Sequence, residues 1–296
     1  MVCQRISLAL GGGGARGLAH LGVIAALRDA QLEIERLVGI SIGSLVGALY
    51  AFHPDIDRVQ ERIVGFLASP AFRRHQQRLS ASQGADRNGS EHSFSWWRRL
   101  TRFLRANYVC GRVLLRQSIL PGDVLRHAAN SLLPDADIAD ACVPLSVVAV
   151  DLLEGAPVIL EKGPVRDAVC ASASIPGIFP PVEFEGRLLC DIGVLNSLPT
   201  LATRSYPTRC LVAVDVSSSL QAVNACQNAV DVLVRVNNIG ENLFRRNVFA
   251  AADLVIRPEV GDVPWFEFSN PSRLIRLGRE AARGAVPGIL DRCCGG

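Results

Sequence analysis

A serine between an apolar strand and an apolar helix constrains the fold of this chain more than any other feature. The hydrophobic pattern predicts a buried strand over 34–40, a sharp turn at Ser41 and a helix over 44–52. Gly39 and Gly43 flank the serine at the G-x-S-x-G spacing. A nucleophilic serine on such a turn has a strained backbone, and larger flanking side chains would collide with the strand and the helix. The helix N-terminus behind the serine offers N–H groups and a positive dipole end.

The same turn also has an ordinary explanation, which the motif alone leaves open. Small residues occur at many tight strand–helix junctions, and an isolated G-x-S-x-G is only moderately specific. The interpretation of Ser41 as a catalytic nucleophile therefore depends on what the rest of the chain offers.

A glycine-rich turn at 11–17 lies between a predicted strand over 6–10 and a predicted helix over 18–30. Its glycines permit close approach of a ligand and can turn several N–H groups inward. The spacing fits a dinucleotide fingerprint, but that motif requires an acidic residue at the end of the second strand, which ends at Ser41 instead. A P-loop requires lysine followed by serine or threonine where Arg16 stands. We therefore favour an oxyanion hole beside the serine, because consecutive strands are commonly neighbours in a sheet.

His20 follows this loop directly and invites the hypothesis of a Ser-His-Asp triad. In the α/β-hydrolase order the histidine comes after the acid, whereas no histidine occurs beyond His127. A hydrogen-bonded structural role for His20 is therefore favoured.

One carboxylate, Asp191, follows a predicted apolar strand over 187–190 and precedes a turn at Gly193. An unpaired carboxylate is costly to bury, so this residue is expected to have a partner. It could cap the turn or pair with an arginine, or it could act as the base for Ser41. Since the chain has no late histidine, Asp191 is the best-placed candidate base.

Strands alternate with helices along the whole chain, which predicts an α/β protein. The strand over 145–151 is almost continuously apolar, as expected for a sheet that is covered on both faces. We predict a three-layer α/β/α sandwich with a mostly parallel central sheet. The chain has 296 residues, 49% of them hydrophobic, enough for one large domain or two small ones. Further strands are expected over 158–161, 210–217 and 250–258, and further helices over 54–70, 121–133, 164–173, 225–249 and 272–285.

Residues 69–116 form a basic insertion, in which ten arginines stand against two acidic residues. Within it, residues 96–105 place Trp, Phe and Leu on one face of a predicted helix and arginines on the other. Such a helix suits a membrane interface, although a lid helix packed on the core has the same pattern. Nucleic acid is not expected as a partner, because the net charge of the chain is only +3. The expected membrane contacts are Trp96, Trp97, Arg98, Arg99 and Arg102.

The nine cysteines are scattered and include no C-x-x-C pair. Cys142, Cys170, Cys190 and Cys210 lie in apolar segments, so we expect reduced, buried thiols in a cytoplasmic protein. The longest uncharged run, 37–52, is shorter than the roughly 20 residues of a membrane span. Any membrane contact is therefore expected to be peripheral, on the inner membrane face. No N-terminal apolar stretch suits a secretory signal, and no His/Cys cluster has metal-ligand spacing.

Three motifs together resemble the patatin-like phospholipase family. They are G-G-G-A-R-G at 12–17, G-I-S-I-G at 39–43 and D-I-G at 191–193. The block at 171–180 and the Ala-Asp pair at 252–253 are similar as well. Each motif alone is weak to moderate, but their order and spacing make the set specific.

The resemblance implies one patatin-like domain over 5–290, similar to the compact bacterial members, with residues 69–116 as a cap or insertion. It also implies hydrolysis of lipid acyl esters without a metal or cofactor. A Ser–Asp dyad would carry the reaction, with Ser41 as the nucleophile and Asp191 as its base.

The resemblance further implies an oxyanion hole formed by the N–H groups of Gly12, Gly13 and Gly14, in a loop that Arg16 helps to hold. The remaining motif positions that support the site are Gly17, Gly39, Gly43 and Gly193.

Two residues depart from the family pattern. Ile40 stands where threonine is frequent, and Ile192 stands where glycine is usual, which leaves the geometry of Asp191 open. The main hypothesis is a serine acyl hydrolase of phospholipids or lysophospholipids. The alternatives are a lipid transacylase and a weakly active or non-catalytic lipid-binding regulatory protein, the last motivated by Ile192.

Overall fold

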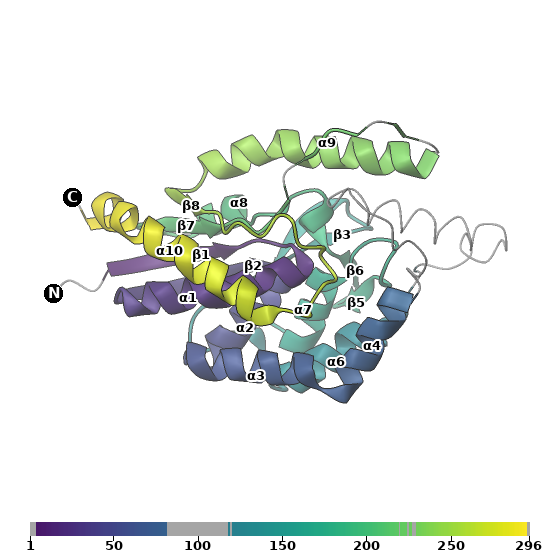
Figure 1. The fold of residues 1–296 in the computed structure, drawn as a ribbon, viewed down its shortest axis with the longest axis horizontal. Coiled ribbons are helices and arrows are strands. Elements are labelled where there is room, and N and C mark those ends of the chain that lie inside the picture. The colour runs from purple at the N-terminus through teal and green to yellow at the C-terminus, as the bar shows by residue number, and fades with distance from the viewer. Residues whose placement is uncertain are drawn as a thin grey trace.

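The structure is a computed structural model that describes residues 4–81, 118, 120–218, 220–223, 225–226 and 229–294 (Figure 1). The predicted helix over 96–105, with its expected membrane contacts, lies outside the described residues. The basic insertion is described only at its start and at residue 118 beyond its end, so its role as a cap stays a prediction. No described helix combines the length and the apolar composition that crossing a membrane requires.

One mixed sheet of eight strands forms the centre of the molecule, in the order β5-β6-β3-β2-β1-β7-β8 with β4 paired to β3. The five strands from β3 to β8 in this order are parallel, whereas β4, β5 and β6 join by antiparallel pairing. The predicted mostly parallel sheet is thereby confirmed. The strand bounds are β1 Gln4–Leu10, β2 Leu32–Ile40, β3 Leu145–Asp151, β4 Ala156–Leu160, β5 Val182–Phe184, β6 Arg187–Cys190, β7 Leu211–Val214 and β8 Leu254–Ile256.

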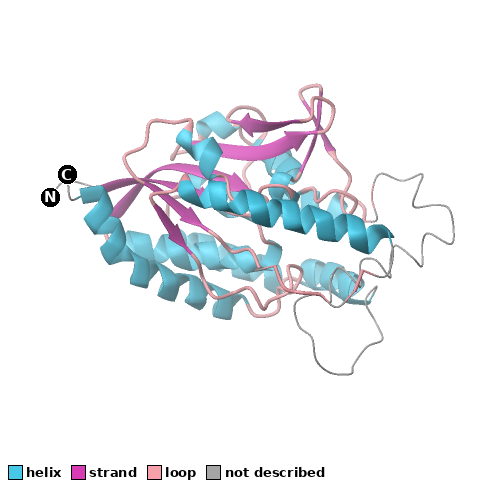
Figure 2. Ribbon diagram, turned by 90° about the horizontal axis from the view of Figure 1, so that it is seen from above, coloured by secondary structure: helices cyan, strands magenta, loops and turns pink. Residues whose placement is uncertain are grey.

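Helices cover both faces of this sheet, which confirms the three-layer sandwich (Figures 1 and 2). Helices α1, α2, α3, α6, α7 and α10 pack together on one side, while α8 and α9 lie on the other. The helix bounds are α1 Ala19–Asp29, α2 Ile42–Phe52, α3 Ile56–Ala68, α4 Pro70–Ala81, α6 Asp123–Leu132, α7 Val165–Ala173, α8 Thr200–Arg204, α9 Ala229–Ala250 and α10 Pro271–Cys294.

The core is built around the two strands that lead to the glycine loop and the serine. In β1 the side chains of Ile6, Leu8 and Leu10 have no exposed surface, and Leu37 in β2 has none either. Burial of such side chains on both faces of parallel strands supplies most of the stabilising free energy of a core. The ends of β1 and β2, and therefore the loops that follow them, are fixed in one position.

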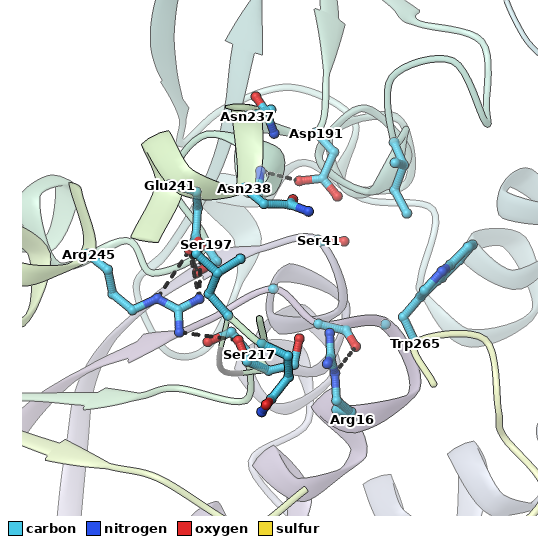
Figure 3. Close-up of a pocket in the computed structure, with 18 of the residues that line it drawn as sticks. Arg16, Ser41, Asp191, Ser197, Ser217, Asn237, Asn238, Glu241, Arg245 and Trp265 are labelled. Atoms are coloured by element: carbon cyan, nitrogen blue, oxygen red, sulfur yellow. Dashed lines mark hydrogen bonds and ion pairs between the residues drawn. The ribbon is translucent and has the colours of Figure 1, made fainter. Parts of the chain in front are cut away.

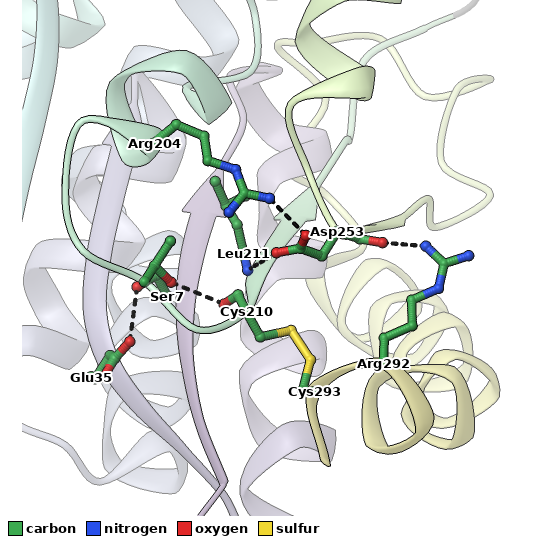
Figure 4. The surroundings of a disulfide bond; sticks show 9 residues. Ser7, Glu35, Arg204, Cys210, Leu211, Asp253, Arg292 and Cys293 are labelled. Atoms are coloured by element: carbon green, nitrogen blue, oxygen red, sulfur yellow. Dashed lines mark hydrogen bonds and ion pairs between the residues drawn. A yellow bond between two sulfur atoms is a disulfide. The ribbon is translucent and has the colours of Figure 1, made fainter. Parts of the chain in front are cut away.

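The expectation of reduced, buried thiols is wrong for two cysteines. Cys210, at the start of β7, forms a disulfide with Cys293 in α10, and Cys142 is exposed (Figure 4). Cys170 and Cys190 are free and buried, as expected. Because disulfides are typical of oxidising compartments, the expected cytoplasmic location loses the support that it drew from reduced thiols.

Candidate active site

Ser41 lies at a sharp elbow between the end of β2 and the start of α2. Its backbone angles are φ 54° and ψ −125°, a conformation that is costly for a residue with a side chain. The flanking glycines are sterically required, as predicted: a Cβ on Gly39 would lie 2.6 Å from the Gly43 carbonyl oxygen, and one on Gly43 would lie 2.3 Å from the Leu10 carbonyl oxygen. The elbow therefore presents a serine that is largely buried but reaches a pocket.

Two buried serines hold this elbow in place. The Ser41 N–H donates to Ser172 Oγ at 2.8 Å, and Ser172 Oγ donates in turn to the Val148 carbonyl at 2.7 Å. Ser44 Oγ donates to the Ser41 carbonyl at 2.6 Å. Sequence reasoning missed the role of Ser172, because α7 supplies it from 131 residues further along the chain.

Asp191 follows β6 and lines the same pocket as Ser41. Its carboxylate accepts a hydrogen bond from the Gly193 N–H at 2.6 Å, and the Ser41 hydroxyl favours its ionised form. The residue is 3% exposed, and this burial raises the pKa of its carboxyl to about 6, although the Ser41 hydroxyl and the Gly193 N–H oppose the rise. A carboxyl with this pKa can hold or release a proton near neutral pH.

Ile192 does not crowd this pair. Its side chain packs with Val38, Ile40 and Val148 in a separate apolar cluster, and it lines a groove that does not include Ser41. The departure from the usual glycine therefore extends the core and leaves the hydrogen bond from the Gly193 N–H to the neighbouring carboxylate in place.

The glycine loop after β1 lies beside the serine, as predicted, but its N–H groups are not equivalent. The Gly12 N–H already donates to the Ser197 carbonyl at 2.8 Å. The N–H groups of Gly13 and Gly14 form no hydrogen bond with a described residue. Arg16 Nε donates to the Gly13 carbonyl at 3.2 Å, the predicted support of the loop, and burial lowers the pKa of this arginine to about 10.

The last motif glycine of the loop, Gly17, packs against the first residue of α2. A Cβ added there would lie 2.2 Å from Ile42 Cγ2. The two motifs that the sequence places apart are therefore in direct contact behind the serine.

His20 has the structural role that the sequence favours. Its side chain is fully buried, and Nε2 donates to the Gly11 carbonyl at 2.8 Å. Burial lowers its pKa to about 4, so the ring is neutral at physiological pH. It anchors the start of the glycine loop and does not line the pocket at Ser41.

A polar pocket opens over the serine on the side of α9 (Figure 3). One of its walls is an ion network in which Glu241 binds Arg245 through both oxygens and accepts from Ser197 Oγ at 2.6 Å. Arg16, Asn237, Asn238 and Trp265 point into the same space. The α9 side chains of this wall were not predicted. The only signal in the sequence is the polar pair at 237–238 within an otherwise amphipathic helix.

An apolar cavity of about 150 Å³ meets the same serine from the other side. Helices α3, α4, α6 and α7 line it, together with the segment that carries Trp265, Phe266 and Phe268. Phe72 of α4, which belongs to the start of the basic insertion, also lines it. Ser41 therefore stands at the boundary between a polar and an apolar space. Among the described residues, no group of three or more His, Cys, Asp or Glu residues could hold a metal ion.

The fold and the site place this protein among the α/β proteins that carry a serine at a strand–helix elbow. The family model for patatin-like phospholipases matches residues 8–204, and the chain belongs to this family. It is 32% identical to an uncharacterized NTE family protein of Mycobacterium tuberculosis over 223 residues, which are 73% of this chain and 50% of that protein.

Two further similarities extend this comparison. Lysophospholipase NTE1 of Candida glabrata is 32% identical over 215 residues, which are 73% of this chain and 11% of that protein. The structure of VipD from Legionella pneumophila has a TM-score of 0.49 and 14% sequence identity, and the match covers 96% of this chain and 67% of that one. The chain thus spans about half the length of its mycobacterial relative and a much smaller share of the yeast one.

Proposed function

We propose that this protein is a serine acyl hydrolase that cleaves carboxylic ester bonds of phospholipids or lysophospholipids. The observation that supports the proposal is that Ser41, on its strained elbow, and the buried carboxylate of Asp191 line the same pocket, where the serine hydroxyl favours the ionised form of that carboxylate. A carboxylate whose pKa is about 6 can take the proton of a neighbouring serine hydroxyl as that hydroxyl attacks. The name of the yeast relative, a lysophospholipase, agrees with this class of substrate.

The reaction would proceed in two steps. Asp191 takes the proton of Ser41 Oγ while the oxygen attacks the ester carbonyl, and the N–H groups of Gly13 and Gly14 stabilise the oxyanion. Gly12, with its N–H engaged by Ser197, holds the loop and does not act as a donor. The leaving alcohol takes the proton back from the carboxyl group. Water then attacks the acyl-serine with the same carboxylate as base, and the fatty acid is released.

The two spaces at the serine fit an amphiphilic ester. The apolar cavity would receive the acyl chain, and the polar pocket, lined by Arg16, Arg235 and Arg245, would receive the phosphate-bearing part. Binding of both ends places the ester carbonyl at the elbow between them, which is the orientation that catalysis needs.

Two alternatives from the sequence remain distinguishable. A transacylase would use the same acyl-serine but pass the acyl group to an alcohol, so an added alcohol acceptor would yield a new ester as the main product. A non-catalytic lipid-binding protein was suggested by Ile192, whose side chain packs away from the serine. Failure of Ser41 to react with a fluorophosphonate probe would favour that alternative.

The decisive experiment is a hydrolysis panel of diacyl phospholipids, lysophospholipids and neutral acylglycerols. We expect fatty acid release from the phosphate-bearing lipids, and loss of turnover by about 10³-fold or more in Ser41→Ala and Asp191→Asn. Ser146→Ala is the matched control, because Ser146 is also buried but bonds with Glu161 and Tyr206, outside both pockets. Near-full ester hydrolysis by Asp191→Asn would refute the dyad.

A further inference from the structure

The outward side of α9 carries a row of exposed apolar side chains. Leu233 is 70% exposed, Val236 62% and Leu243 63%, and Val232 and Ile239 accompany them, while Phe244 lines the groove beneath the helix. Residues 232, 236, 239 and 243 follow one another at intervals of four, three and four, which places them along one face of a helix. Soluble proteins seldom expose such a continuous apolar face unless it meets a partner or a membrane.

The charged residues of α9 favour the same kind of partner. Among its described side chains Arg246 is the only charged one that is exposed, and the carboxylate of Asp231 is partly buried. Glu241 is turned inward, where it binds Arg245 and Ser197. An apolar face accompanied by a cation and free of exposed carboxylates is typical of helices that lie in the interface of an anionic bilayer.

The position of α9 connects this face to the active site. The helix is the outermost element on its side of the sheet (Figures 1 and 2), and its inner side contributes Asn237, Asn238 and Glu241 to the polar pocket at Ser41. Beneath it runs a groove whose lining includes three more exposed apolar side chains, Ile159, Leu195 and Leu201. Among the described residues, most of the exposed large apolar side chains therefore lie on α9 or line this groove.

We propose that the outward face of α9 docks on the surface of an anionic phospholipid bilayer, with the polar pocket opening beside the contact. Only the choice of a lipid partner rests on the proposed function; the apolar and cationic face does not depend on it. A lipid surface also explains why α9, which forms a wall of the polar pocket, is apolar on its outward face. The helix would contact the same bilayer from which the lipid substrate enters the pocket.

Vesicle binding of the full chain tests this proposal in the Ser41→Ala background, so that a failure of hydrolysis and a failure of docking are separate results. The vesicles contain equal parts of phosphatidylcholine and phosphatidylglycerol. We expect Leu233→Ser, Val236→Ser and Leu243→Ser together to lower the partition coefficient at least tenfold, since tenfold corresponds to 1.4 kcal/mol, about the burial of one such side chain. Arg246→Glu should weaken binding to these vesicles but not to pure phosphatidylcholine.

The control is the pair Leu152→Ser and Leu153→Ser, because these two side chains are 49% and 69% exposed at the β3–β4 turn and do not belong to α9. It should bind like the parent. Equal losses in both variants, or no binding by the parent, would overturn the proposal. So would a dimer in sedimentation that the α9 changes dissociate without affecting vesicle binding, because the face would then bind a second copy.

A second variant keeps the test decisive if the triple substitution unfolds the protein. Val236→Trp preserves the apolar character of the face and places a fluorophore at its centre. On adding vesicles we expect the emission that this variant gains over the parent, which has Trp96, Trp97 and Trp265, to shift to shorter wavelength and to be quenched by brominated acyl chains. If the variant binds the vesicles and its emission does not change, the membrane contact lies elsewhere on the molecule.

Discussion

The carboxyl group of Asp191 is exposed by only 3%, and its pKa of about 6 lies well above the ordinary value of 3.8. In the folded protein the group therefore binds its proton more tightly than in the unfolded chain. Its contribution to stability is complete below pH of about 4 and is lost as the pH rises through about 6. The folded protein is thus less stable when Asp191 is ionised, which is the form that serves as a base, than when it is protonated.

Asp191→Asn should therefore increase stability while it removes activity. At pH of about 8 we expect the variant to exceed the parent by up to about 3 kcal/mol in unfolding free energy, and near pH 4 the two should be similar. Urea unfolding at both pH values measures this difference. The turnover of the parent should fall as the pH drops below about 6, where the base becomes protonated. A variant that is less stable than the parent at the higher pH would contradict the assigned burial cost.

Ile192 is predicted to matter for stability and not for chemistry. Ile192→Ala removes a side chain that is only 6% exposed among Val38, Ile40 and Val148, and should cost about 2–4 kcal/mol of unfolding free energy. Turnover per folded molecule should stay within about twofold of the parent, because the side chain points away from Ser41. Active-site titration with a fluorophosphonate, combined with urea unfolding, separates the two quantities. A tenfold loss of turnover in fully folded variant protein would mean that Ile192 positions Asp191.

At the scale of elements, the strand–serine–helix unit could be predicted because its signals are local. An apolar strand, two close glycines and an apolar helix lie within about twenty residues, and each part restricts the others. The structure starts the helix at Ile42, two residues before the predicted start, since the helix begins directly after the elbow. What secures the elbow could not be predicted, because the Ser172 hydroxyl reaches it from α7.

Ser172→Ala tests whether the elbow at Ser41 depends on the Ser172 hydroxyl. It leaves the buried Ser41 N–H without its partner, so we expect a loss of about 1–3 kcal/mol in stability. A less firmly held elbow should also lower turnover and fluorophosphonate labelling by about tenfold or more. The matched control is Ser174→Ala, since Ser174 is also buried at the end of α7 but its hydroxyl bonds only to the Cys170 carbonyl. If both variants lose labelling equally, the contact to the elbow has no special role.

Contacts between distant elements account for the other features that the sequence did not reveal. Cys210 and Cys293 have Cα atoms 5.6 Å apart only because the end of α10 packs beside the start of β7. A search for paired cysteines at short spacing gives no sign of a bond across 83 residues. The same holds for the α9 wall of the polar pocket. Glu241 and Arg245 become part of a site only because α9 packs beside Ser41 and the glycine loop.

At the scale of the whole molecule, the sheet divides the surroundings of the serine into two chemically different halves. Helices α3, α4, α6 and α7 on one side produce the apolar cavity, and α9 on the other side produces the polar pocket. Ser41 is reached from both because the elbow lies at the end of a central strand, where loops from both layers meet. An amphiphilic ester would bind with its two ends in opposite layers.

If the apolar cavity holds the acyl chain, reducing its volume should change chain-length preference. Ala128 lies on α6 and lines the cavity, and Ala128→Phe places a ring where the far end of a long chain would lie. We expect the kcat/KM ratio of long-chain to short-chain p-nitrophenyl esters to fall by about tenfold or more, since each displaced methylene is worth a factor of about ten or more. Ala202→Phe, in the groove beside Ile192, is the matched control and should leave that ratio unchanged. An equal loss for both esters in Ala128→Phe would indicate general damage and would place the acyl chain outside this cavity.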